Sequence, residues 1–207
     1  MKKYEEWMNG KIYLCPEEEP RFVQGRAERK DLIFDFNNTK PSKLNFDLIR
    51  PIFASVGKNA YIEPPFHANC GGMFTHIGDD FYANFGLILV DDGPIYIGNN
   101  VLFGPNVMIT TTGHPVEPTL RKKLYQYSEP VTIKDNVWIG GDVVILPGVT
   151  IGENSVIGAH STVSKDIPAN CIAMGNPCKV IREIEEKDKE FYFRDKRFPE
   201  DIAKEIE

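Results

Sequence analysis

The sequence predicts a mainly β protein: a solenoid of short parallel strands, preceded by a small α-helical cap and followed by a tail. Three observations support this. An aliphatic residue returns every six positions over a long stretch, helical apolar spacing is confined to the first third, and one long segment interrupts the repeat. We therefore expect a helical cap over residues 1–57, a solenoid over 58–184 with an excursion over 110–130, and a C-terminal extension over 185–207.

The cap is expected to contain two or three short helices. Apolar residues recur at helical spacing in three segments, which end at Gly10, at the turn composition NNTKPS and at Gly57. The apolar positions are Tyr4, Trp7 and Met8, then Leu32, Ile33 and Phe36, then Leu48, Ile49, Ile52 and Phe53.

The solenoid follows from six consecutive hexads that begin at Ile133: IKDNVW, IGGDVV, ILPGVT, IGENSV, IGAHST and VSKDIP. Position one is Ile or Val throughout, and position five is Val, Ser or Ile, so apolar residues alternate as in a strand with one buried face. Position three breaks this alternation and suits a corner. Three hexads close a triangular turn whose strands pair in parallel with those of the next coil. The same period holds upstream from Ile77, with a two-residue slip before Ile97.

The bulk composition excludes several classes of function. The 207 residues suit one sizeable domain, and the net charge of -6 argues against nucleic acid or an anionic membrane as the main partner, because either needs extensive clusters of Lys and Arg. The four cysteines show no CxxC spacing, which is typical of thiols in a reducing compartment. No apolar leader or membrane-length segment is visible, so we expect a cytoplasmic protein.

Eight motifs resemble those of the galactoside and maltose O-acetyltransferases among the hexapeptide-repeat acyltransferases. They are IEPPF (62–66), FYANFG (81–86), VDDGPIYIGNNVLFGPNV (90–107), TGHPV (112–116), NVWIGG (136–141), LPGVTIG (146–152), VIGAHSTVSKDIP (156–168) and GNPCKVIREI (175–184). The resemblance spans nearly the whole chain, including the tail FYFRDKR. It implies a left-handed parallel β-helix, a homotrimer with active sites between subunits, acetyl-CoA as co-substrate, a sugar hydroxyl as acceptor and no metal.

His114 is the expected catalytic residue. Of the four histidines, it alone lies in the segment that interrupts the solenoid, between Gly113, which permits a sharp turn, and Pro115, which favours extended backbone before it. A sugar hydroxyl needs a general base, and histidine titrates in the appropriate range. The resemblance of TGHPV to the family motif implies that His114 takes the acceptor proton and returns it to the CoA sulfur. His67 lies in an irregular entry segment that is compatible with a place near the sugar, but it is not counted among the expected site residues.

The resemblance assigns the acceptor to Asn84 and Asp92, with Asp91 as the alternative carboxylate. Asn and Asp also occur at structural corners, which is the competing interpretation. Cys70 is also assigned to the acceptor, although Cys15 and Cys70 stand where relatives have polar residues, which leaves open whether acceptor preference differs. Beyond His114, the excursion is expected to reach over a neighbouring subunit's site, with Gln126 and Tyr127 touching the acceptor.

The resemblance places CoA along the outside of the coils, with Gly141 donating its backbone N–H to the thioester oxygen. Contacts with the pantetheine arm are expected from Trp138, Gly141 and Ala159 and from the backbone of Ser164 and Lys165. Contacts with the phosphates are expected from Lys165, Lys179 and Arg182. The competing interpretation of the charged residues is that they are ordinary solvent-exposed side chains. For Trp138 the competing interpretation is a place in a subunit interface.

Three rival functions remain open. A gamma-carbonic-anhydrase-like metal enzyme would need three histidines between subunits, and the four histidines here do not match its spacing. A non-catalytic trimeric scaffold would need no histidine-bearing excursion. Acetylation of a non-sugar hydroxyl, as on an antibiotic, would use the same mechanism.

Overall fold

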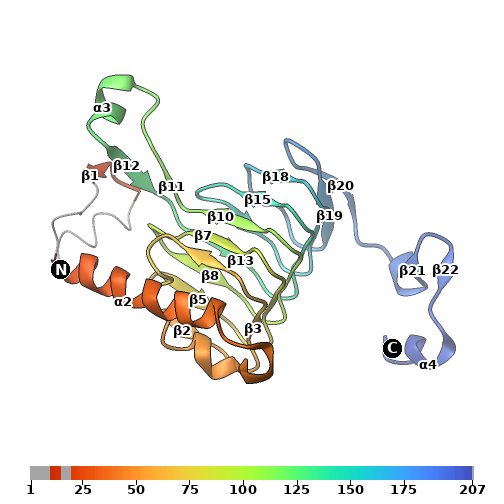
Figure 1. Cartoon of the computed structure of the whole chain (residues 1–207). Helices are drawn as coiled ribbons and strands as arrows, with labels where there is room; N and C mark the ends of the chain where they lie inside the picture. The colour runs from red at the N-terminus through yellow and green to blue at the C-terminus, as the bar shows by residue number, and fades with distance from the viewer. Residues whose placement is uncertain (1–9, 15–19, 207) are drawn as a thin grey trace.

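The computed structural model describes residues 10–14 and 20–206, and the solenoid dominates it (Figure 1). Three sheets of parallel strands form its faces, and the chain passes from face 1 to face 2 to face 3 in each coil.

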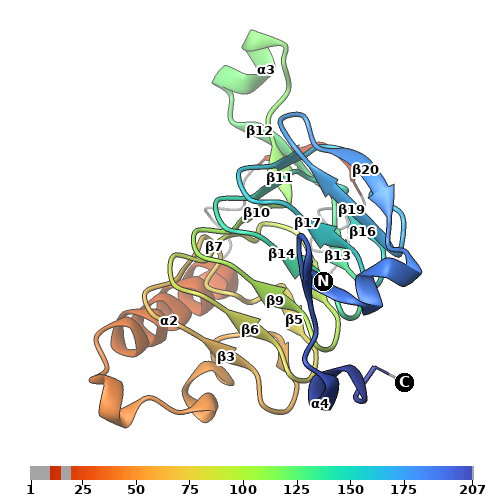
Figure 2. The same cartoon turned by 90° about the vertical axis from the view of Figure 1, so that its right-hand side faces the viewer.

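Face 1 contains β2 (Ser55–Val56), β5 (Thr75–Ile77), β8 (Ile95–Ile97), β13 (Val131–Ile133) and β16 (Thr150–Ile151). Face 2, which is turned to the viewer in Figure 2, contains β3 (Tyr61–Ile62), β6 (Tyr82–Ala83), β9 (Leu102–Phe103), β14 (Trp138–Ile139), β17 (Val156–Ile157) and β19 (Cys171–Met174), with β20 (Lys179–Glu183) antiparallel at its end. Face 3 contains β4 (His67–Ala68), β7 (Ile88–Val90), β10 (Met108–Thr110), β15 (Val144–Ile145) and β18 (Thr162–Val163).

The predicted assignment of residues to hexad positions is confirmed by which side chains are buried. Positions one and five point inward; Ile139, Val143 and Ile145, for example, are each 0% exposed. The register stacks like positions directly, as Ile97, Ile133 and Ile151 do on face 1. The predicted mainly β solenoid is therefore confirmed, while its handedness stays a prediction.

The corners depend on position four of the hexad, which the sequence analysis had not singled out. Asn136, Asp142, Asn154 and His160 all adopt left-handed φ values between 57° and 61°. Asn and Asp tolerate this conformation better than other non-glycine residues. Their side chains also join successive coils, since Asn136 Nδ2 donates to Asn154 Oδ1 at 2.9 Å.

The breaks in the period gather at one edge, the corner between faces 3 and 1. Leu89 and Ile97, which hold equivalent core positions on consecutive strands, are eight positions apart, and Ile109 and Ile133 are 24 apart. In the later coil Ile145 and Ile151 keep the spacing of six. The slip before Ile97 and the long excursion are therefore insertions stacked at the same corner.

One long helix of the cap, α2 (Pro20–Asn37), lies along the first coils (Figure 1). It buries Ile33 and Phe36 as expected, but Leu32 is 37% exposed, so its place in the buried stripe was wrong. Asn37 fixes the helix to the coil, because its side chain both donates to Phe66 O at 2.8 Å and accepts from Phe66 N at 3.0 Å.

The third cap segment forms two 3₁₀ turns, η1 (Pro41–Lys43) and η2 (Phe46–Ile49), instead of the expected α-helix. Pro51, which has no backbone N–H to donate, follows η2 closely, and Asn45 caps η2 by accepting from Asp47 N. The expected helix with Tyr4, Trp7 and Met8 lies outside the described residues, as does Cys15.

The excursion, residues 110–130, is an ordered arm that projects from the coil (Figure 1). Its strands β11 (Thr112–Gly113) and β12 (Tyr125–Ser128) are antiparallel, α3 (Pro118–Lys122) forms its tip, and β1 (Tyr13–Leu14) pairs with β12 from the other side. Gly113 therefore lies in a strand and not in the sharp turn that was expected. A Cβ added there would lie 2.6 Å from the Tyr127 hydroxyl oxygen, so the glycine leaves room for that ring in its present position.

The C-terminal extension leaves the coil beyond β20 and lies to one side of it (Figure 1). It contains η3 (Glu186–Lys189), β21 (Phe191–Phe193), β22 (Lys196–Arg197) and α4 (Glu200–Ala203). The boundaries 1–57, 58–184 and 185–207 stay a prediction. Among residues 10–14 and 20–206, no helix has the length and apolar character needed to cross a membrane.

Candidate functional site

A cavity of about 680 Å³ opens between α2, face 3 and the base of the arm. Its polar lining comes from Lys30, Asn37, His67, Asn69, Asp92, Thr112, His114 and Gln126, and its apolar lining from Ile33, Phe34, Ala68 and β7. We call it the arm cavity. It brings together three residues that the sequence predicted for catalysis or acceptor binding: Asp92, His114 and Gln126.

His114 is oriented by the backbone of the returning arm strand. Its Nδ1 lies 2.8 Å from the carbonyl oxygen of Tyr125. Because a carbonyl oxygen only accepts, Nδ1 carries the proton in this contact, and in the neutral imidazole the lone pair is therefore on Nε2. An exposed imidazole held in this tautomer is suited to remove a proton from a bound hydroxyl.

Gln126 is held by the N-terminal strand β1, a contact that the sequence analysis missed. Its Nε2 donates to the Tyr13 hydroxyl at 3.0 Å, and that hydroxyl lies 2.6 Å from Ser128 Oγ. Burial raises the pKa of Tyr13 above its ordinary value, against the opposing effect of these hydrogen bonds, so the phenol stays neutral. The Tyr13–Gln126 pairing across β1 and β12 could not be read from the sequence, because 112 residues lie between them.

The two adjacent aspartates divide their roles. Asp91 is 0% exposed, and its carboxylate accepts from Cys70 N at 2.7 Å and Gly72 N at 2.8 Å. Burial raises the pKa of Asp91 to about 6, assisted by the charge of Asp92 and opposed by these N–H donors. Asp92 faces the arm cavity instead. The cavity-side carboxylate is therefore Asp92, and Asp91 secures the loop below it.

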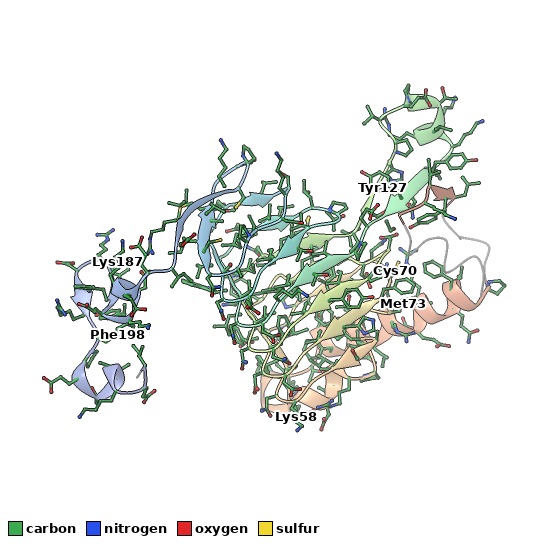
Figure 3. The ribbon with its side chains drawn as sticks, turned by 180° about the vertical axis from the view of Figure 1, so that it is seen from behind. Lys58, Cys70, Met73, Tyr127, Lys187 and Phe198 are labelled. Carbon is green, nitrogen blue, oxygen red and sulfur yellow. The ribbon has the colours of Figure 1, made fainter. Side chains whose placement is uncertain are left out.

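Asn69, and not its neighbour Cys70, reaches the arm cavity. Cys70 is 1% exposed and belongs to a small apolar cluster with Tyr13 and Phe22, between the coil and α2 (Figure 3). Asn69 Nδ2 donates to Asp92 Oδ2 at 2.9 Å. Both residues lie in the turn after β4, where strand alternation does not set the side-chain directions, so the sequence carried no pattern to distinguish them.

Asn84 and Tyr127 lie apart from the arm cavity within one chain. Asn84 follows β6 at the corner between faces 2 and 3, and its Oδ1 accepts from Phe85 N at 2.8 Å, as a corner residue does. Tyr127 stands at the base of the arm, where its ring covers Gly113 (Figure 3). Gln126, which was expected to reach a neighbouring subunit, lines the cavity of its own chain.

Four of the seven residues predicted for CoA lie at two separate edges of face 3. Gly141 and Ala159 follow β14 and β17 at the corner between faces 2 and 3, the corner that also carries Asn84. Within the described part of the chain, neither of their backbone N–H groups has a hydrogen-bond acceptor. Ser164 and Lys165 follow β18 at the opposite corner, below the arm.

Trp138 and Arg182 border a second hollow, of about 520 Å³, between face 2 and the C-terminal extension. Trp138 is 54% exposed. Arg182 donates from both Nη atoms to Asp188, at 2.6 and 2.7 Å, and this guanidinium holds the pKa of the Asp188 carboxyl at about 2. Lys179 is exposed on β20, the same strand as Arg182.

Across the described segments 10–14 and 20–206, no group of three or more His, Cys, Asp or Glu side chains is placed to hold a metal ion.

Comparison with known proteins decides the family. The bacterial transferase hexapeptide (six repeats) model matches residues 130–165. The chain is 54% identical over 172 residues to a galactoside O-acetyltransferase of Escherichia coli (strain K12), covering 82% of this chain and 84% of that protein. The chain belongs to the hexapeptide-repeat acetyltransferases.

Two solved structures of this acetyltransferase family share the fold over almost all of their length. A galactoside acetyltransferase in complex with coenzyme A has a TM-score of 0.89 at 47% identity, covering 96% of this chain and 99% of that one. A maltose O-acetyltransferase from Clostridium difficile 630 has a TM-score of 0.84 at 44% identity, covering 90% and 99%. The family predicted from the sequence motifs is confirmed.

Proposed function

We propose that this acetyl-CoA-dependent O-acetyltransferase transfers the acetyl group to a hydroxyl of a galactoside, maltose or a related sugar, with His114 as general base. The observation that carries the proposal is the pairing of His114 and Asp92 in one cavity, with Nδ1 of the imidazole engaged by Tyr125 O. Membership of the acetyltransferase family supplies the reaction class.

In the proposed mechanism the acceptor hydroxyl lies against Nε2 of His114. As its oxygen attacks the thioester carbonyl carbon, Nε2 takes the hydroxyl proton, and the imidazolium is stabilised through Nδ1–H and the Tyr125 carbonyl. The C–S bond then breaks, and Nε2 returns the proton to the departing CoA sulfur. Asp92 accepts hydrogen bonds from neighbouring sugar hydroxyls and so fixes which hydroxyl meets His114.

The two edges of face 3 support a homotrimer with active sites between subunits. The Gly141–Ala159 corner and the His114 corner are separated by strands of two or three residues, or roughly 10 Å at ~3.3 Å per residue. One chain cannot bring both edges to one thioester. In a cyclic trimer, the Gly141 edge of one subunit would meet the His114 edge of the next, where the Gly141 N–H would donate to the thioester oxygen.

The small corner residues fit the pantetheine arm of CoA. Gly141 and Ala159 leave open backbone at their corner, Trp138 offers an exposed apolar surface, and Lys165, Lys179 and Arg182 offer cations for phosphates. These residues, with the backbone of Ser164, are the proposed CoA contacts. Acetyl-CoA as co-substrate makes the cytoplasm the expected compartment.

The acceptor contacts are proposed for Asn84, Asp92, Gln126 and Tyr127, with Cys70 acting from beneath the cavity. A non-sugar hydroxyl, as on an antibiotic, is the alternative acceptor, because the same base would serve it. Turnover of acetyl-CoA, followed by release of free thiol, across galactosides, glucosides, maltose and non-sugar alcohols distinguishes them.

Two further outcomes address the other rivals. Stoichiometric zinc that is lost in His114→Ala would support a metal enzyme, and failure to bind acetyl-CoA in calorimetry would support a scaffold. Sugar-dependent thiol release that disappears in His114→Ala supports the proposal, whereas wild-type rates in that variant would overturn it.

A further inference from the structure

We infer that Arg26 is a positioning residue for acetyl transfer: it fixes the Asp92 carboxylate through Asn69. This inference rests on the proposed function. Arg26 lies on α2, outside the solenoid, and reaches Asn69 with two donors: Nε to the backbone oxygen at 2.7 Å and Nη2 to Oδ1 at 2.9 Å. Asn69 in turn donates from Nδ2 to Asp92 Oδ2 at 2.9 Å.

The two-point contact decides which way the Asn69 amide faces. With Oδ1 engaged by the guanidinium, Nδ2 is the atom presented to Asp92. Were the amide reversed, Oδ1 would oppose a carboxylate oxygen, and two acceptors would meet. The planar fork of arginine suits simultaneous contact with a backbone oxygen and a side-chain oxygen, which a lysine ammonium cannot reproduce.

The loop that carries Asn69 is held from two sides. Beneath it, the buried Asp91 carboxylate accepts from Cys70 N and Gly72 N. Above it, α2 packs so closely that a Cβ on Gly71, whose φ is +71°, would lie 2.6 Å from Arg29 Cβ. The backbone position of Asn69 is therefore fixed, and Arg26 sets the remaining freedom of its side chain.

Asp92 keeps one oxygen for the acceptor. Its Oδ2 is engaged by Asn69, whereas Oδ1 has no hydrogen-bond donor in the described part of the chain. A carboxylate only accepts, so the group that Oδ1 recognises is an O–H of the acceptor. The direction of Oδ1 depends on Asn69, and through it on Arg26.

The test is steady-state kinetics on the purified full-length protein, with both substrates varied, using Arg26→Gln, Arg26→Lys, Asn69→Ala and the Arg26→Gln/Asn69→Ala double variant. Arg29→Gln is the matched control. Arg29 lies one turn further along α2 and donates to the backbone oxygens of Ile52 and Gly25, with no link to Asp92.

We expect Arg26→Gln and Asn69→Ala each to raise the acceptor KM about tenfold while the acetyl-CoA KM stays unchanged, as for loss of an aligned hydrogen bond to a charged group. Because both act through one contact chain, the double variant should exceed the single variants by no more than about twofold. Arg26→Lys should behave like Arg26→Gln, and Arg29→Gln should keep wild-type KM values at a comparable Tm.

The inference is overturned by wild-type acceptor KM in Arg26→Gln, by multiplicative effects in the double variant, or by full rescue in Arg26→Lys, which would assign the effect to charge alone. Asn69→Ala leaves α2 intact, so it tests the inference even if Arg26→Gln does not fold. Absence of sugar-dependent turnover in the wild-type protein would instead overturn the proposed function.

Discussion

The imidazole of His114 and the backbone of Tyr125 are joined across the arm by a 2.8 Å contact between Nδ1 and the carbonyl oxygen. The two residues stand on opposite limbs of the arm, so the orientation of the base depends on how β12 returns past β11. Because the partner is a backbone atom, no side-chain substitution at Tyr125 removes it directly. The arm therefore acts on the proposed base through its fold.

Replacing His114 tests the base itself. His114→Ala should lower kcat by about 10²–10⁴-fold, the usual contribution of general base catalysis, while acetyl-CoA binding by calorimetry stays close to wild type. His76→Ala is the control, since His76 is stacked on Tyr96 on face 1, away from the arm cavity. A kcat within twofold of wild type in His114→Ala would exclude His114 as the base.

Replacing Gly113 tests the proposed acceptor contact of Tyr127. In Gly113→Ala the new methyl would overlap the far end of the Tyr127 side chain, whose Cζ would lie 2.7 Å away, so this ring, 36% exposed, must turn away from β11. We expect the acceptor KM to rise about tenfold, as for loss of a contact with the bound acceptor, while kcat stays close to wild type because the contact of His114 with the Tyr125 carbonyl is kept. Thiol-release kinetics with saturating acetyl-CoA and varied acceptor measure this.

Truncating the ring provides the matched control. Adding Gly113→Ala to Tyr127→Ala should cause no further rise in the acceptor KM, because the overlapping atoms are already absent. If the double variant is clearly worse than Tyr127→Ala alone, the glycine is required for some reason other than room for Tyr127.

The coil could be predicted from the sequence because the residues that stabilise it are local and recur every six positions. Each hexad carries its own buried pair, as Ile139 and Val143 do, and six copies fix the phase. The cap was harder to predict: the sequence indicated the helix α2, but the next expected helix forms two 3₁₀ turns instead. Position four of the hexad was missed because Asn, Asp, Gly and His share no obvious property except tolerance of left-handed backbone.

The site was predictable only where a motif carried it. His114 and Asp92 were found through TGHPV and VDDG, whereas Asn69, Arg26 and Tyr13 came only from contacts between segments far apart in the chain. The long-range pairing of β1 with β12 leaves no periodic trace in the sequence. The choice between Asp91 and Asp92 needed the structure, since either could face inward until the register of β7 was known.

The CoA half of the site is tested through Arg182. Arg182→Gln should raise the acetyl-CoA KM about tenfold with little change in kcat, because an ion pair with a phosphate contributes to binding and not to the chemical step. Arg197→Gln is the control, since Arg197 pairs with Glu190 in the same extension, where its Nη1 lies 3.0 Å from Oε2. An unchanged acetyl-CoA KM in Arg182→Gln would assign the guanidinium to Asp188 alone, as an anchor for the extension.

The buried carboxyl of Asp91 should make stability depend on pH. Its folded-state pKa, about 6, lies above the ordinary value of 3.8, so the folded protein retains a proton that the unfolded chain releases between these values. A raised pKa stabilises the fold at low pH, and this contribution is lost as pH rises through about 6.

Asp91→Asn removes the titration while keeping the size of the side chain. We therefore expect the free energy of unfolding of the wild type, relative to Asp91→Asn, to increase by about 2 kcal/mol between pH 7 and pH 4. Urea unfolding of both proteins across this range measures the difference, and titrating groups that do not interact with Asp91 cancel in the comparison. A difference that is constant with pH, or that shrinks as pH falls, would show that Asp91 is not the buried, proton-retaining group that its position beneath the Asn69 loop indicates.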